Sequence, residues 1–127
     1  MKIVIEGNPI PLQRARASKK GFYDPQLIIK RNIAHIVKEQ FKREPFTEAL
    51  SISLDFYMQI PVSWSKKKKL AYDTMPHANH KDLDNLIKLI LDSLNAVVWI
   101  DDSIIYHIDA YKFWSHDART ILTIGEV

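Results

Sequence analysis

Apolar and polar side chains alternate over several parts of the chain. The clearest case is residues 50–60, where every second residue from Leu50 to Ile60 is apolar, which predicts a strand with one buried face. Residues 2–6 show a shorter version of the same pattern. Residues 104–113 and 120–124 predict further strands, and the short apolar run 97–100 predicts a buried strand.

Two other segments repeat their apolar residues at helical spacing. Asp24 and Pro25 are typical of an N-cap and a first helical position, so a helix is predicted from there to about Lys42. Its apolar stripe is Leu27, Ile28, Ile33, Ile36, Val37 and Phe41. A second helix is predicted after Asp84, with the stripe Leu83, Leu86, Ile87, Ile90, Leu91 and Leu94. Residues 66–72 are compatible with a short helix, and residues 13–21 are basic and loop-like.

The order of these elements predicts an α+β fold, in which two main helices pack on a mixed β-sheet. The length of 127 residues and the 46% hydrophobic content favour one domain over residues 1–127 with its own core. The chain has no cysteine, which excludes disulfides and thiolate metal sites. The apolar stretches at residues 1–5 and 96–100 are too short for a signal peptide or a membrane span. We therefore expect a soluble cytoplasmic protein with no membrane partner.

Charge is distributed unevenly along the chain, although the formal net charge is only +3. Residues 1–81 contain 15 Lys and Arg against 7 Asp and Glu, whereas residues 82–127 contain 3 against 8. This division is typical of a polyanion-binding protein that also gathers cations at one place, although chance clustering of solvated charges is the alternative. The residues predicted to contact nucleic-acid phosphates are Arg14, Arg16, Lys19, Lys20, Lys66, Lys67, Lys68 and Lys69. Trp64 and Phe22 beside them either stack on unpaired bases or pack in the fold.

The acidic second part contains a group of residues that suits metal chemistry. If residues 82–84 are extended, Asp82 and Asp84 point to the same side, and the helix that follows favours negative charge there. Lys88 lies one helical turn after Asp84, and of Asp101 and Asp102 at most one joins the group. Three carboxylates repel one another unless a cation offsets them, and hard oxygen ligands suit Mg²⁺ or Mn²⁺. Taken singly, each feature is also explained by helix capping, a turn or an exposed lysine.

Three short motifs occur together with these residues: DLDNLIK at 82–88, WIDD at 99–102 and PVSWSKKKK at 61–69. In residue type, order and spacing, this combination strongly resembles the RusA family of Holliday junction resolvases. The resemblance extends from about Leu50 to the C-terminus and is looser over residues 1–42.

The resemblance implies an α+β homodimer that binds four-way-junction DNA and cuts two strands symmetrically with Mg²⁺, or Mn²⁺ in its place. It assigns Asp82, Asp84 and Asp102 as metal ligands and Lys88 as the essential lysine, so all four are candidate catalytic residues. The segment between the second helix and the next strand is slightly shorter than in the family, which leaves Asp101 as the alternative to Asp102.

The function predicted on this basis is an endodeoxyribonuclease that resolves Holliday junctions in DNA recombination and repair. One alternative is a non-catalytic branched-DNA-binding protein of phage or prophage origin. Another is a metal-dependent phosphodiesterase that acts on nucleotides, which the many dispersed basic residues disfavour because they suit a polymer.

Overall fold

The computed structural model of the chain describes residues 1–13, 16–18 and 21–126, with the side chains of residues 16–18, 22 and 126 outside the description. The described elements are β1 (Lys2–Glu6), β2 (Arg16–Ser18), β3 (Gly21–Tyr23), α1 (Leu27–Gln40), β4 (Leu50–Gln59), α2 (Lys66–Tyr72), α3 (Leu83–Leu94), the 3-10 helix η1 (Asp102–Ile104), β5 (Ile105–Ser115) and β6 (Arg119–Glu126). The strand predicted at the N-terminus and the short helix at residues 66–72 are confirmed.

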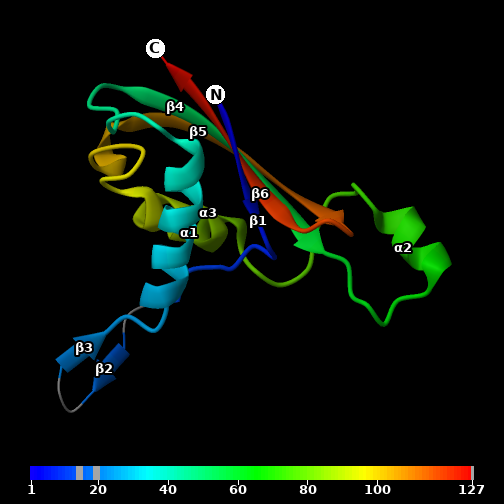
Figure 1. The fold of residues 1–127 in the computed structure, drawn as a ribbon. Coiled ribbons are helices and arrows are strands. Elements are labelled where there is room, and N and C mark those ends of the chain that lie inside the picture. The colour runs from blue at the N-terminus through cyan, green and yellow to red at the C-terminus, as the bar shows by residue number, and fades with distance from the viewer. Residues whose placement is uncertain (14–15, 19–20, 127) are drawn as a thin grey trace.

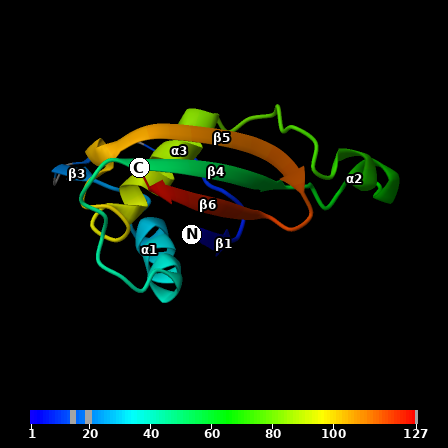
Figure 2. The ribbon, with the colours of Figure 1, turned by 90° about the horizontal axis from the view of Figure 1, so that it is seen from above.

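Four strands form one mixed sheet in the order β1–β6–β4–β5 (Figures 1 and 2). Strand β4 pairs in parallel with β5 and antiparallel with β6, which in turn pairs antiparallel with β1. Because parallel neighbours cannot be joined by a tight turn, a long crossover must connect β4 to β5. Residues 60–104 form this crossover and contain α2 and α3. The predicted α+β fold with a mixed sheet and two main helices is confirmed.

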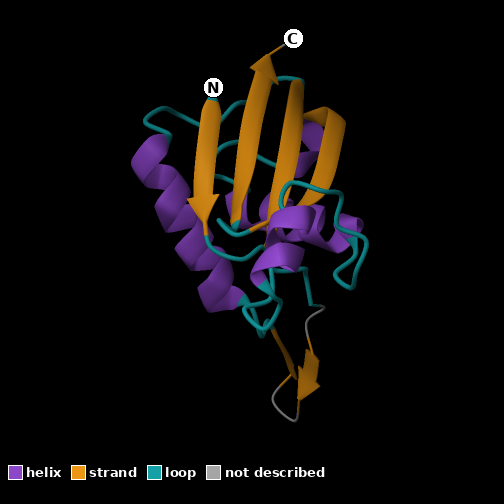
Figure 3. Cartoon of the chain, turned by 90° about the vertical axis from the view of Figure 1, so that its right-hand side faces the viewer, coloured by secondary structure: helices purple, strands orange, loops and turns teal. Residues whose placement is uncertain are grey.

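The alternation along β4 divides the sheet into two different faces. Ile52, Leu54 and Phe56 are at most 1% exposed and belong to the core under the helices. The residues between them in sequence, such as Ser53 and Asp55, are half-buried on the opposite face. Figure 3 looks onto that opposite face, with α1 and α3 behind the sheet. The core therefore lies on one side of the sheet, as the pattern predicts.

The two main helices contribute unequally to the core. Helix α3 buries Leu86, Leu89, Ile90 and Leu94, whereas Val37 is the fully buried residue of α1. Ile28, which belongs to the predicted stripe of α1, is 72% exposed. It lies in the first turns of α1, which extend away from the sheet toward β3 (Figure 1). No helix in the described ranges is long and apolar enough to cross a membrane.

The N-terminus of α1 differs from the prediction. The helix begins at Leu27 after a turn in which the Leu27 amide donates to the Asp24 carbonyl at 3.4 Å. The Asp24 carboxylate accepts from the Gln26 amide at 2.9 Å and from the Lys30 ammonium at 2.8 Å. Asp24 therefore caps a turn before the helix rather than the helix itself, and α1 ends at Gln40 rather than Lys42.

Residues 13–21 were expected to form a loop, but part of this segment pairs as a hairpin. Strands β2 and β3 run antiparallel, with Arg16 opposite Tyr23 and Ser18 opposite Gly21. Gly21 has a φ of 110°, a conformation that glycine adopts at no steric cost. Three-residue strands are too short to produce a recognisable alternation, which is why the pattern did not predict them.

The strand predicted at residues 97–100 is absent, since this segment is a turn that follows α3. Val98 and Trp99 are fully buried, but Ile100 is half exposed. Backbone hydrogen bonds link Phe46 to Val98 and Ile100 at 2.8 and 3.0 Å and form an isolated bridge at Trp99. A short apolar run indicates burial, and it does not distinguish a strand from a buried turn.

Candidate active site

The acidic residues of the DLDN motif lie at the N-terminal end of α3. The helix begins at Leu83, so Asp84 is in its first turn, and Asp82 precedes it in an extended conformation with φ −62° and ψ 136°. The prediction that residues 82–84 are all extended is therefore wrong. The two residues occupy instead the N-cap and the second position of the helix, where its dipole favours negative charge.

Neither carboxylate is used to build a standard helix cap. The Asp82 side chain makes no capping hydrogen bond, and the Asp84 carboxylate accepts from the amide of its neighbour Asn85 at 2.9 Å. Both residues are exposed. Oxygen atoms at this end of α3 are therefore accessible to a cation or to a ligand that carries one.

Lys88 connects α3 to the segment that holds the second acidic pair. Its ammonium lies 3.3 Å from the Asp92 carboxylate and 3.6 Å from the Asp102 carboxylate. The hydrogen bond and charge of Asp92, followed by those of Asp102, raise the pKa of Lys88 and keep it protonated. Because the Lys88 side chain is 51% exposed, these ion pairs orient the ammonium more than they stabilise the fold.

Asp92 is a residue of this site that the sequence analysis missed. It pairs with Lys88 and also lies 4.0 Å from the ammonium of Lys30, which is itself bound by Asp24 at 2.8 Å. The signal was present in the sequence, because Asp92 lies four residues after Lys88 and a helix brings such positions together. Asp92 thus connects α1 to the lysine of the site.

The two aspartates of the WIDD motif have different surroundings. Asp101 is the N-cap of η1, and its carboxylate accepts from the Ser103 amide at 3.0 Å. Hydrogen bonds from Ser103 lower the pKa of Asp101. Asp102 turns toward Lys88 and is 26% exposed. Of the two, Asp102 is the one whose carboxylate forms an ion pair with Lys88.

Within the described ranges, no group of three or more His, Cys, Asp or Glu side chains is arranged to hold a metal ion. Asp82 and Asp84 nevertheless fit Mg²⁺ in their chemistry, because this ion is usually bound by one or two carboxylates together with waters and substrate phosphates. Asp102 is paired with Lys88 in this arrangement. Such donors fit an open Mg²⁺ site that a phosphate would complete better than they fit a closed protein cage.

The lysine-rich segment forms a separate unit at one end of the sheet, which we call the basic arm (residues 61–77). Helix α2 projects there from the rest of the molecule (Figure 1). The Ser65 hydroxyl caps α2 by accepting from the Lys68 amide at 3.2 Å. Lys66 and Lys67 are exposed and Lys69 is half-buried. The Lys68 ammonium lies 4.0 Å from the centre of the Trp64 ring.

Aromatic packing holds the basic arm against β5. The Trp64 ring lies 4.9 Å from that of Trp114 and 5.2 Å from that of Tyr72. The His77 ring lies 4.1 Å from Trp114. Trp64 is therefore engaged in packing, which is the second of the two roles considered for it. Burial, followed by the charge of Lys112, lowers the pKa of His77, whose buried Nδ1 atom has no hydrogen-bond partner.

The other basic residues lie in or near the β2–β3 hairpin. Arg14, Lys19 and Lys20 lie outside the described residues, and of Arg16 only the backbone in β2 is described. The hairpin and α2 lie at opposite ends of the molecule, with α3 between them in both views (Figures 1 and 2). A polyanion that contacted both ends would pass α3.

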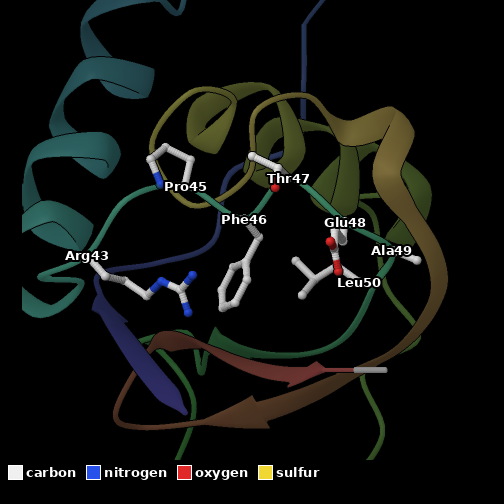
Figure 4. Close-up of a pocket in the computed structure, with 7 residues that line it drawn as sticks. All are labelled: Arg43, Pro45, Phe46, Thr47, Glu48, Ala49 and Leu50. Atoms are coloured by element: carbon white, nitrogen blue, oxygen red, sulfur yellow. The ribbon is translucent and has the colours of Figure 1, made fainter.

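Two cavities lie away from the carboxylates of the site. One of about 460 Å³ is lined by residues 43 and 45–50, where the Arg43 guanidinium lies 3.9 Å from the centre of the Phe46 ring (Figure 4). A second of about 460 Å³ lies between α1, α3 and residues 5–10. Neither is lined by Asp82, Asp84 or Asp102. Asp82 and Asp84 are instead exposed, so a large substrate can approach them.

Comparisons with known proteins bear on this arrangement. Residues 6–125 match the family model of endodeoxyribonuclease RusA. The chain belongs to the RusA endodeoxyribonuclease family. It is also similar to YqaN of Bacillus subtilis (strain 168), an uncharacterized protein, with 27% identity over 137 aligned residues that cover the whole of this chain and 96% of the relative. The RusA match includes every residue predicted for the site, and it supports an endodeoxyribonuclease.

Proposed function

We propose that this RusA-family chain is a divalent-metal-dependent endonuclease that resolves Holliday junctions by paired symmetric nicks during DNA recombination and repair in the cytoplasm. The observation that carries the proposal is the RusA match over residues 6–125. The exposed carboxylates at the N-terminal end of α3, with a protonated lysine one helical turn away, support it. We further propose a homodimer, because a two-fold axis would present two equivalent sites to symmetry-related strands.

In this proposal Asp82 and Asp84 hold Mg²⁺, or Mn²⁺ in its place, together with a phosphate of the substrate. When bound, such an ion lowers the pKa of a water and stabilises negative charge on the phosphodiester. Asp102 is the third proposed ligand, and its approach requires its ion pair with Lys88, at 3.6 Å, to loosen. A substrate phosphate that attracts the Lys88 ammonium would separate it from Asp102. The Asp102 carboxylate would then be available to the metal ion, and Lys88 would pair with the phosphate.

Lys88 is proposed to stabilise the charge that develops on the scissile phosphate. Its raised pKa keeps the ammonium charged at neutral pH, and an ion pair with Asp92, one turn further along α3, restrains its position. A preoriented cation needs little reorganisation when the phosphate becomes more negative, which is the main advantage of such a group over water.

DNA binding is proposed to use the basic arm at one end and the β2–β3 hairpin at the other. Lys66, Lys67, Lys68 and Lys69 would contact phosphates from α2, and the residues Arg14, Arg16, Lys19 and Lys20 would do so near the hairpin. Phosphate contacts set affinity and its dependence on salt and carry little sequence information. If the two ends of the molecule bind the DNA backbone, the surface of α3 between them, which has few basic residues, is left for phosphodiester cleavage.

The test is cleavage of a synthetic four-way junction with a linear duplex of the same sequence as control. We expect paired nicks in the junction with Mg²⁺ or Mn²⁺ and none with a chelator present. The variant Asp82→Asn removes one proposed ligand and should lower the cleavage rate by about 100-fold or more, as loss of a key electrostatic group commonly does. Asp109→Asn, an exposed aspartate of β5, is the matched control and should cleave like the native protein.

The Lys88–Asp102 ion pair also favours a second candidate, a non-catalytic branched-DNA-binding protein, because it neutralises one of the proposed ligands. Tight junction binding without cleavage, in Mg²⁺ and Mn²⁺ alike, would establish this second function and overturn the first. Equal cleavage of the junction and the duplex would support nuclease activity but contradict the proposed preference for junctions.

A further inference from the structure

A lysine lies on the side of the sheet that faces the core. In the parallel pairing of β4 and β5, Lys112 lies opposite Phe56, one of the most buried residues of the protein. Its neighbours on the same face of β5 are Ala110 and Trp114. Among such neighbours an ammonium is favoured only where it reaches water or polar partners, and both hydrogen bonds of the Lys112 ammonium lie at exposed positions. Lys112 is half-buried and has two such partners.

Both partners are backbone carbonyls of the segment that leads into α3. The Lys112 ammonium donates to the Lys81 carbonyl oxygen at 2.9 Å and to the Asn79 carbonyl oxygen at 3.2 Å. The backbone of Lys112 also contacts the start of the same segment, because its carbonyl oxygen accepts a hydrogen bond from the His77 amide at 2.9 Å. One residue of β5 therefore holds residues 77–81 by its main chain and by its side chain.

The segment needs such a restraint because its last residue is strained. Lys81 has a φ of 84°, in the left-handed region that residues with a Cβ atom disfavour. Its carbonyl belongs to the peptide that joins it to Asp82, so the orientation of that peptide sets where α3 begins. The Asp82 side chain makes no capping hydrogen bond that would hold it in place. The hydrogen bond from Lys112 reaches the carbonyl of this peptide from outside the helix.

We propose that Lys112 is a positioning residue for the proposed reaction, because it clamps the turn at residues 79–81 and so holds Asp82 at the N-terminal end of α3. The proposal rests on the function proposed above. The proposed role is to hold the turn and not to contact DNA, and two of the three N–H donors of the Lys112 ammonium already bind carbonyl oxygens. Strain of this kind is found at functional sites where the surrounding structure enforces it.

The test compares three variants in single-turnover cleavage and junction-binding assays. Lys112→Met keeps the length of the side chain and removes its donors, so the cleavage rate should fall about tenfold while the dissociation constant for the junction changes less than about twofold. Lys112→Arg keeps N–H donors and should restore most of the rate. Lys2→Met removes a lysine from the opposite edge strand and should have no effect on the rate. A Lys112→Met protein that cleaves normally, or that loses binding in proportion to rate, would overturn the proposal.

A second measurement does not depend on cleavage. Amide hydrogen exchange of residues 79–83 should be at least about tenfold faster in Lys112→Met than in the native protein, with exchange in β4 unchanged. Unchanged exchange in residues 79–83 would contradict the clamp even if activity fell. If the native protein proved inactive on junctions, the proposed function would fail, and this exchange measurement would still decide whether Lys112 holds the turn.

The left-handed conformation of Lys81 allows a sharper version of the test. Asparagine adopts this conformation more readily than lysine does, so Lys81→Asn should make the clamp less necessary. In the Lys81→Asn background, Lys112→Met should then lower the cleavage rate only about threefold rather than tenfold. An equal loss in both backgrounds would show that Lys112 acts other than through this turn.

Discussion

The N-terminal end of α3 and the basic arm are both strongly charged, but they are held in place by different means. At α3, charged groups restrain one another: Asp92 and Asp102 bind Lys88, and Lys112 binds the turn before Asp82. In the basic arm, aromatic packing of Trp64 and Trp114 holds the base of the unit, while Lys66 and Lys67 are exposed. Groups that act on one phosphate must be fixed closely, whereas groups that attract a long polyanion need only be near it. The difference suggests that cleavage and binding can be removed separately.

The largest effect is expected from Lys88→Met. The ammonium is the one cation among the predicted site residues at α3, so its loss should lower the cleavage rate by about 100-fold or more. Single-turnover cleavage of a four-way junction measures this. Lys38→Met, which changes an exposed lysine of α1, is the control and should leave the rate unchanged. Cleavage by Lys88→Met within about twofold of the native rate would remove Lys88 from the proposed chemistry.

The triple variant Lys66→Gln, Lys67→Gln, Lys69→Gln should affect binding instead. Each lost phosphate contact reduces the slope of log affinity against log salt by about 0.9, so three contacts should reduce it by about 2–3. Titration of a junction at several salt concentrations gives the slope. The matched control changes the lysines at positions 2, 38 and 42, away from the basic arm, to glutamine. An unchanged slope in the arm variant would mean that α2 does not touch DNA.

A smaller effect should follow from loosening the arm without changing its charge. Trp64→Ala removes the ring that packs on Trp114 and Tyr72, so amide exchange in α2 should increase. Junction affinity should fall about threefold, because ordering the arm then costs free energy on binding. Leu70→Ala, which changes a residue of α2 that is 75% exposed, should leave both exchange and affinity unchanged. A fall in the cleavage rate of saturated enzyme would contradict the separation of the two regions.

The smallest effect concerns pH. Burial lowers the pKa of His77, so the unfolded chain takes up a proton more readily than the folded one. The free energy of unfolding should therefore fall as pH drops below about 6.5, down to the pKa of the folded state. His77→Phe keeps a ring against Trp114 and removes the titrating group, so urea unfolding of this variant should depend less on pH between about 5 and 7. Equal pH dependence in both proteins would show that His77 is protonated freely in the fold.

Much of the fold follows from the sequence because its elements are long and periodic. Strand β4 alternates over ten residues, and α3 carries a continuous apolar stripe, so both were predicted within one or two residues. The segment after α3 was predicted wrongly because Val98 and Trp99 are buried by a turn and one bridge to Phe46. That bridge joins residues far apart in the sequence, and local periodicity contains no information about it.

The candidate site, too, was predicted only in part from the sequence. The sequence predicts which carboxylates form the site and that they lie beside a helix, but it misplaces the start of α3 by assuming an extended Leu83 and Asp84. The pairing of Lys88 with Asp92 follows from helical spacing alone. The contact of Lys112 with Lys81 spans 31 residues and depends on the sheet register. The sequence analysis did not single out Lys112, because its core-facing position follows from the register of β5 with β4.

The most direct test of the separation between the two regions measures cleavage and binding together on two variants. Asp84→Asn should lower the cleavage rate by about 100-fold or more while the dissociation constant for the junction stays within about twofold, because it removes an exposed carboxylate and no basic contact. The triple lysine variant of the basic arm should bind more weakly yet cleave at the native rate once the junction is saturating. The contradicting result is an Asp84→Asn protein that cleaves within about threefold of the native rate, since the carboxylates at the N-terminal end of α3 would then not carry the reaction.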